Sequence, residues 1–170
     1  RVFLLWTMQL QGGDVLQWLV IVLSCLYIRV VRAGCMIPPN EQGYVWINQA
    51  TIPNNAFRQC LELKSVKIGS AVKSIGVSAF NGATALETVD FGESSAVTSI
   101  GKSAFYRCTS LVSLTIPDSV TELGNSAFYG CSSLESVVIG ASLKAITSHD
   151  FYLCTSLKTL TIGSGVESIG

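Results

Sequence analysis

The sequence contains little charge and no excess of either sign. Its 170 residues include 11 Lys+Arg and 11 Asp+Glu, so the formal net charge is zero and 13% of residues are charged. Proteins that bind nucleic acid or anionic surfaces usually carry a basic patch or stripe. The composition therefore gives no electrostatic basis for such a partner, and we expect no nucleic acid among the ligands.

Residues suited to catalysis or metal binding are also scarce. His149 is the only histidine and lies in the turn SHD at 148–150, where the sequence positions no nucleophile for it. The patterns GxxxxGK[ST], GxSxG and HExxH are absent, and the scattered carboxylates form no acid–base pair. We interpret His149 as a solvated turn residue, and we expect no enzyme, no catalytic residue, no cofactor and no metal site.

Long apolar runs are confined to the start of the chain. The uncharged stretch Val15–Ile28 has 14 residues, whereas a helix that spans a membrane needs about 20. If the Arg29 side chain reaches the headgroups, the span extends over residues 15–31. We therefore expect residues 1–35 to form an apolar N-terminal helix that serves as a membrane or export segment.

The role of this segment has three open interpretations. It is an export signal cleaved before Gly34, an uncleaved transmembrane anchor, or an incorrectly bounded N-terminus. Arg29 and Arg32 favour a cytoplasmic location for the residues that follow, because positive charge beside an apolar helix stays on the cytoplasmic side. Residues 36–43 contain two adjacent prolines, and we expect them to be a linker.

A repeat of about 23 residues fills residues 44–170. Five phenylalanines mark it, with separations of 23, 25, 23 and 23, and a leucine follows each one at the sixth position. The second unit carries two extra residues around Glu93–Ala96, and a degenerate earlier unit is expected over Tyr44–Ile52. The markers are Phe57, Phe80, Phe105, Phe128 and Phe151, with Leu63, Leu86, Leu111, Leu134 and Leu157.

A repeat of this length predicts a solenoid. One unit is too small to bury its own apolar side chains, whereas stacked units bury one another in a continuous core. The segment LxxLxI, as in Leu111–Ile116, predicts a short strand from which Thr115 points away from the core. A second short strand and a glycine turn close most units. We therefore expect a β-rich solenoid over residues 44–170, truncated at the C-terminus.

Residues 114–139, LTIPDSVTELGNSAFYGCSSLESVVI, resemble the BspA-type leucine-rich repeat. The family pattern is IPxSVxxIGxxAFxxCxxLxxVxI, and the resemblance covers about residues 51–170. It implies a leucine-rich-repeat solenoid of the kind found in surface and secreted proteins of bacteria and protists, with adhesion or protein binding as the usual role. The sequence departs from the pattern at Ala83, at Thr147 and near Glu93, and we expect these changes to disturb packing only locally.

Four cysteines share one position of the repeat: Cys60, Cys108, Cys131 and Cys154. Their spacings of 48, 23 and 23 lack the CxxC pair of metal sites. Ala83 fills the same position in the remaining unit, so the position requires a small apolar group, and a buried free cysteine serves as one. We interpret these cysteines as packing residues, although neighbouring coils bring such side chains close to disulfide distance.

The outward side of the LxxLxI strand is the candidate binding face. Side chains eight and ten residues after each phenylalanine alternate with buried ones, so we expect them to face solvent. Solenoids bind partners on such extended faces, although serine and threonine also suit an exposed strand without a ligand. Few aromatic residues occur in these series, so no hot spot is evident. The candidates are Ser65, Lys67, Thr88, Asp90, Ser113, Thr115, Ser136, Val138, Thr159 and Thr161.

Together these features lead us to expect a non-catalytic protein–protein interaction or adhesion module. We expect it to be secreted or at the cell surface, membrane-associated, with a protein or an extracellular host ligand as its partner. One alternative is a cytoplasmic leucine-rich-repeat scaffold, in which the cysteines stay reduced. The other is the recruitment part of a larger protein whose further domain is missing from this sequence.

Overall fold

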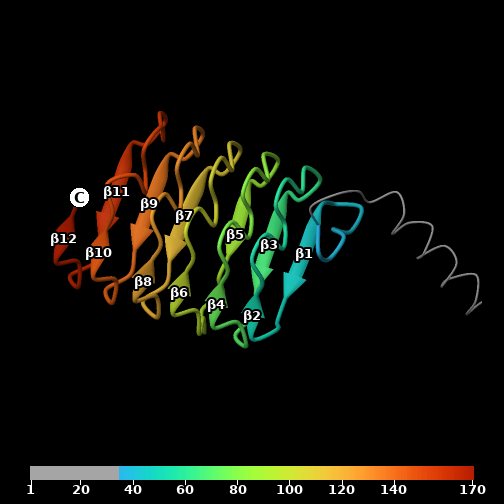
Figure 1. Cartoon of the computed structure of the whole chain (residues 1–170), viewed down its shortest axis with the longest axis horizontal. Helices are drawn as coiled ribbons and strands as arrows, with labels where there is room; N and C mark the ends of the chain where they lie inside the picture. Colours follow the sequence, from blue (N-terminus) through green and yellow to red (C-terminus); the bar gives the residue numbers. More distant parts are fainter. Residues whose placement is uncertain (1–34) are drawn as a thin grey trace, which may run out of the picture. The chain divides into compact units, whose positions relative to one another are not determined.

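The computed structural model describes residues 35–170, which form a solenoid of stacked coils (Figure 1). Each coil contributes one longer strand and one two-residue strand, and these lie in two rows along the stack. The longer strands are β1 (Tyr44–Ile47), β3 (Ser65–Ile68), β5 (Thr88–Asp90), β7 (Ser113–Ile116), β9 (Ser136–Ile139) and β11 (Thr159–Ile162). The short strands are β2 (Thr51–Ile52), β4 (Ser74–Ile75), β6 (Ser99–Ile100), β8 (Glu122–Leu123), β10 (Ala145–Ile146) and β12 (Ser168–Ile169).

The apolar helix expected over residues 1–35 falls, except for Cys35, outside the described residues. Within residues 35–170, no helix is long and apolar enough to cross a membrane. The proposed export or anchor role of the N-terminal segment therefore stays a prediction from its sequence.

The segment predicted as a linker, residues 36–43, packs against the first coil. The Met36 N–H donates to the Ala56 carbonyl at 2.6 Å, and the Ile37 side chain packs on the core. The Asn40 side-chain oxygen then accepts hydrogen bonds from the backbone N–H groups two and four residues later. These contacts lead the chain directly into β1.

Equivalent apolar side chains stack in buried columns, as the repeat predicts. Leu86, Leu111 and Leu134 are each 0% exposed. The five marker phenylalanines stack with ring centroids 5.0 to 5.6 Å apart and planes within 8° of parallel, an offset arrangement that aromatic rings favour. Each fully buried side chain of this size stabilises the fold by about 1.5–3 kcal/mol. In the last coil, which packs against one neighbour, Leu160 and Ile162 are 39% exposed.

The strands alternate between buried and exposed side chains. In β7, Leu114 and Ile116 are buried while Ser113 and Thr115 are exposed, which confirms the predicted outward direction of Thr115. All strand pairs are parallel, so equivalent residues of successive coils lie side by side. The longer strands therefore present rows of outward side chains along the solenoid.

Two departures from the repeat coincide with two breaks in strand pairing among the described coils. In the row of longer strands, β1, β3 and β5 form one sheet and β7, β9 and β11 form another. The break between β5 and β7 lies where the second unit has its two extra residues. In the other row, β2, β4, β6 and β8 pair, and β10 pairs with β12. The break between β8 and β10 lies where Thr147 replaces glycine.

The second break has a steric cause. At Gly101 an added Cβ would lie 2.7 Å from the carbonyl carbon of Gly76 in the preceding coil, so only glycine permits this approach. Thr147 carries such a Cβ, so the same close approach is not open to it. The Gly101 N–H donates to the Ile75 carbonyl at 2.8 Å, whereas the Thr147 N–H donates to the Asp150 carboxylate at 2.6 Å.

Asp150 stands where the other coils have alanine, and it is fully buried. Its Oδ2 accepts hydrogen bonds from the Thr147 N–H at 2.6 Å and from the Thr147 hydroxyl at 2.9 Å. Its Oδ1 accepts from the Ala127 N–H of the preceding coil at 3.2 Å. The carboxylate therefore accepts the hydrogen bond that the Thr147 N–H does not donate to the preceding coil, and it links two coils whose short strands are not paired.

Candidate binding face

The candidate residues line up along the row of longer strands. Eight of the ten predicted side chains are exposed, whereas Ser65 and Ser136 are half-buried. Thr115 lies beside Val138 in β9 and Val138 beside Thr161 in β11. The break between β5 and β7 divides these residues into two groups. The four candidates of β3 and β5 form one group, and the six candidates of β7, β9 and β11 form the other.

Two exposed aromatic residues extend this face at β1. Tyr44 pairs with Ser65 and Trp46 pairs with Lys67, and their exposed fractions are 36% and 58%. Tyrosine and tryptophan are the residues most enriched at the energetic centres of protein interfaces. Neither residue is among the ten predicted candidates, although the degenerate unit at Tyr44–Ile52 and the alternation within a strand place both outward.

Ion pairs link neighbouring coils within and beside this face. The Lys67 Nζ lies 3.8 Å from Asp90 Oδ2, and the Lys158 Nζ lies 3.0 Å from Glu135 Oε1. All four side chains are about half exposed or more, and pairs of this kind contribute about 0–1 kcal/mol to stability. These charges therefore remain free to exchange partners when a ligand binds.

Cys60 is not the free packing residue that the sequence predicts. It forms a disulfide with Cys35, 25 residues earlier, and the two Cα atoms are 5.1 Å apart. Met36, beside Cys35, is hydrogen-bonded to Ala56 in the same turn as Cys60, which brings the two thiols together. The bond fastens the segment before β1 to the next coil.

The other three cysteines of the repeat position are free, and Cys108 and Cys131 are buried, as predicted. Burial raises the pKa of the Cys108 thiol well above its usual range. The neighbouring Cys154 thiol, followed by burial, raises the pKa of Cys131, and the neighbouring Cys131 thiol lowers the pKa of Cys154. Cys154 is half-buried, so it is the most reactive thiol of the three.

The turn at His149 pairs the imidazole with a serine hydroxyl, and Asp150 points elsewhere. The Ser148 hydroxyl lies 2.9 Å from His149 Nδ1, a pair that the sequence analysis did not anticipate. Both residues are exposed, and the neighbouring Asp150 carboxylate is buried on Thr147 and Ala127 instead of orienting the imidazole. Within residues 35–170, no group of three or more His, Cys, Asp or Glu is placed to hold a metal ion.

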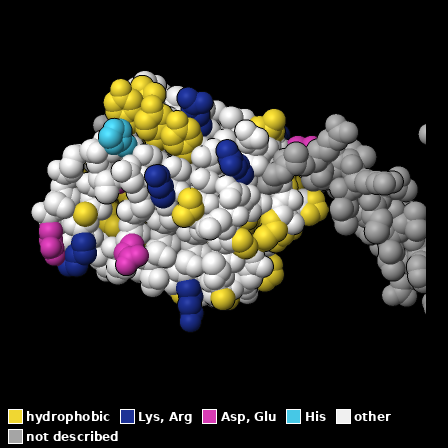
Figure 2. Space-filling model, in the orientation of Figure 1, with side chains coloured by type: hydrophobic (Ala, Val, Ile, Leu, Met, Phe, Trp, Pro, Cys, Tyr) yellow, Lys and Arg dark blue, Asp and Glu magenta, His cyan; other side chains and the backbone are white. Residues whose placement is uncertain are grey.

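A second aromatic group, in which Tyr152 is exposed and Tyr106 and Tyr129 are half-buried, lies on the turns that follow the phenylalanine column. The rings of Tyr106 and Tyr129 stack at 4.7 Å, and those of Tyr129 and Tyr152 lie 5.3 Å apart. The Arg107 guanidinium lies over the Tyr106 ring, and His149 lies at 6.0 Å from Tyr152. Figure 2 shows a hydrophobic patch beside the single histidine. The dipeptide Phe-Tyr, present in three successive units, is its signal in the sequence.

Residues 50–170 match six copies of the family described as BspA type Leucine rich repeat region. This chain belongs to the BspA-type leucine-rich repeat family. The match confirms the resemblance seen in the repeat. No curated protein matches this member of the family.

Solved structures of leucine-rich-repeat proteins are similar to this BspA-type chain. A leucine rich cell surface protein from Faecalibacterium prausnitzii is 34% identical, with a TM-score of 0.68 over 74% of this chain and 33% of its own. The leucine-rich repeat protein of T. pallidum is 26% identical, with a TM-score of 0.55 over 75% of this chain and 72% of its own. The pneumococcal vaccine antigen PcpA shares the fold. It is 22% identical, with a TM-score of 0.57 over 75% of this chain and 29% of its own. The chain spans about a third of the length of the first relative.

Proposed function

We propose that the repeats form a non-catalytic module that binds a protein partner on the candidate binding face, outside the cytoplasm. The observation that carries this proposal is the row of outward side chains that begins at the exposed Trp46 and continues along strands held by a rigid column of stacked rings. A preordered surface loses little conformational entropy on binding, which favours recognition. The leucine-rich cell surface relative is consistent with the same location.

The disulfide favours an extracellular or surface location over the cytoplasmic alternative. Disulfides such as Cys35–Cys60 form and persist in oxidising compartments and are rare in the cytosol. The free cysteines Cys108 and Cys131 do not oppose this, because they are buried and serve as packing residues. Alkylation of the native chain in the cells that carry it tests the location. Cys35 and Cys60 are expected to react with a maleimide only after reduction, and reaction without a reductant would favour the cytoplasmic scaffold.

Photo-crosslinking tests the binding face. We expect p-benzoylphenylalanine in place of Thr115 to capture a protein from the surroundings of the native chain, and the same group in place of Glu122 on β8 to capture none. Trp46→Ala is expected to lower the yield at position 115 at least tenfold, since a tryptophan at an interface centre contributes about 2 kcal/mol or more. Equal capture from both positions, or an unchanged yield in the Trp46 variant, would show that the face is not the binding site.

A further inference from the structure

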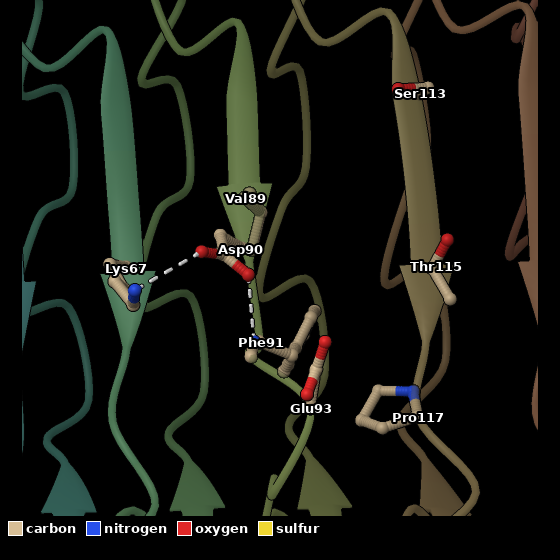
Figure 3. Close-up of a pocket in the computed structure, with 9 residues that line it drawn as sticks. Lys67, Val89, Asp90, Phe91, Glu93, Ser113, Thr115 and Pro117 are labelled. Atoms are coloured by element: carbon tan, nitrogen blue, oxygen red, sulfur yellow. Dashed lines mark hydrogen bonds and ion pairs between the residues drawn. The ribbon is translucent and has the colours of Figure 1, made fainter.

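The two breaks in the strand rows differ in what spans them. At the break between β5 and β7, Asp90 and Thr115 line an open hollow of about 650 Å³ on the candidate binding face (Figure 3). At the break between β8 and β10, side chains connect the coils instead. Besides Asp150, two cysteines meet there, because Cys131 lies in the turn after β8 and Cys154 in the turn after β10. The two thiols therefore lie where the short strands are not paired.

The Cys154 side chain reaches back to the backbone of Cys131 in the preceding coil. Its Sγ donates to the Phe128 carbonyl at 3.2 Å, and the Cys131 N–H donates to the same oxygen at 3.3 Å. Just before the cysteines, the Gly130 N–H donates to the Tyr152 carbonyl at 2.8 Å. This hydrogen bond holds the two turns side by side, and the thiols are neighbours as a result.

The spacing of these turns suits a disulfide. Ring centroids of the flanking phenylalanine and tyrosine pairs lie 5.6 and 5.3 Å apart, and disulfides join Cα atoms that are about 4.4–6.8 Å apart. The Cys35–Cys60 bond gives a comparison within the chain. Cys60 occupies the same repeat position as Cys131 and Cys154, and its Cα lies 5.1 Å from that of Cys35. This repeat position therefore already supports one disulfide.

We propose that Cys131 and Cys154 form a second disulfide when the chain meets a peroxide, and that this bond joins the coils covalently at the break between β8 and β10. The Cys154 thiolate attacks one oxygen of hydrogen peroxide, the O–O bond breaks, and hydroxide leaves a sulfenic acid on Cys154. The Cys131 sulfur then attacks the Cys154 sulfur, the S–O bond breaks, and the Cys131 proton leaves with the hydroxyl group as water. Two thiols lose two electrons in total, and one peroxide becomes two waters.

The two cysteines have different roles in this reaction. Cys154 meets the peroxide first, because it is half-buried whereas Cys131 is buried, and because its pKa is lowered beside the Cys131 thiol. Cys131 resolves the sulfenic acid because it is the adjacent thiol. Cys108 lies one coil before Cys131 and two coils before Cys154, so it is the more distant thiol. None of the three belongs to the candidate binding face, and the bond is independent of the proposed binding role.

Peptide mapping without a reductant tests the pairing. The full-length chain is treated with hydrogen peroxide and digested with chymotrypsin, which cuts after Tyr129 and so separates Cys131 from Cys108. We expect a linked pair of peptides that contains Cys131 and Cys154 and is lighter than the two free peptides by two hydrogen atoms. A link between Cys131 and Cys108, or sulfinic acid at Cys154 without any link, would overturn the proposal. These outcomes are measured in the unmodified sequence and do not depend on the folding of a variant.

Two alanine variants separate the roles of the cysteines. Cys108→Ala is the matched control, because alanine already fills this repeat position at Ala83, and we expect it to form the same linked pair as the unmodified chain. Cys131→Ala is expected to form no linked pair and to accumulate a sulfenic acid at Cys154, which dimedone traps. Equal loss of the link in both variants would show that Cys131 is not the specific partner.

Hydrogen exchange tests what the bond does to the solenoid. We expect peroxide to slow exchange of the β10 amides at least about tenfold, because a cross-link between neighbouring coils suppresses their local opening. Exchange in β3 is expected to stay unchanged, and Cys131→Ala is expected to show no slowing in β10. Unchanged exchange in β10 after the link has formed would overturn the proposed effect on the break between β8 and β10.

Discussion

Replacing Asp150 by alanine tests whether its carboxylate compensates for Thr147. The substitution restores the residue that other coils carry, yet it removes the acceptor of three hydrogen bonds, two from Thr147 and one from Ala127. An unpaired buried donor costs about 1–3 kcal/mol. The two Thr147 donors are only half-buried and regain water, and loss of the buried charge recovers part of its desolvation penalty. We therefore expect Asp150→Ala to lower the free energy of unfolding by about 2–3 kcal/mol.

The decisive comparison is the same substitution in a Thr147→Gly background. Glycine at position 147 removes the Cβ that prevents the close approach, so its N–H can donate to the Leu123 carbonyl, as the Gly124 N–H donates to the Ile100 carbonyl at 2.8 Å. The carboxylate is then no longer needed as an acceptor. We expect Asp150→Ala to cost less than about 1 kcal/mol there, a coupling energy of about 2 kcal/mol between the two sites.

Urea unfolding followed by circular dichroism measures the four variants of this cycle. Because solenoid coils can open separately, hydrogen exchange at the backbone amides of β8 and β10 shows where stability is lost. We expect the exchange rates to rise in β10 and to change little in β3. An equal cost of Asp150→Ala with threonine and with glycine at position 147 would refute the reasoning.

Two further predictions concern the core. Leu111→Ala removes a fully buried side chain and is expected to lower the free energy of unfolding, measured in urea, by about 2–5 kcal/mol. Thr115→Ala is expected to lower it by less than about 0.5 kcal/mol. Equal losses would contradict the assignment of inner and outer faces. Iodoacetamide is expected to modify Cys154 before Cys108 and Cys131 in the native chain, because the lowered pKa of Cys154 leaves more thiolate at a given pH. The rate of Cys154 modification is expected to rise with pH over a lower pH range than that of an unperturbed thiol. Peptide mapping by mass spectrometry measures the modification of each cysteine. Faster labelling of Cys108 than of Cys154 would exclude this order.

The solenoid, its buried columns and the outward direction of the candidate residues were predictable from the sequence. Each follows from spacing alone, because parallel stacking places residues at one repeat position, such as Leu111 and Leu134, directly beside each other. Trp46 was equally predictable once the degenerate first unit was placed in the same register. The binding role of the face stays a prediction.

Features outside the repeat period were not predictable in the same way. Cys35 has no repeat position, so nothing in its spacing pairs it with Cys60. The two extra residues near Glu93 indicate a disturbance, but whether they bulge outward or open the strand row depends on how Phe91 and Gly92 direct the chain. In the sequence Asp150 is an isolated polar residue at an alanine position, and its hydrogen bonds to Thr147 could not be predicted without the structure.

The Cys35–Cys60 bond also determines how the molecule responds to mechanical tension. A pull on the chain ahead of Cys35 passes through the covalent bond to Cys60, so β1 and β2, which lie between the two cysteines, are shielded from being peeled off the stack. Under shear we therefore expect β1 and β2 to stay on the stack while the bond is intact, and to peel away once it is reduced.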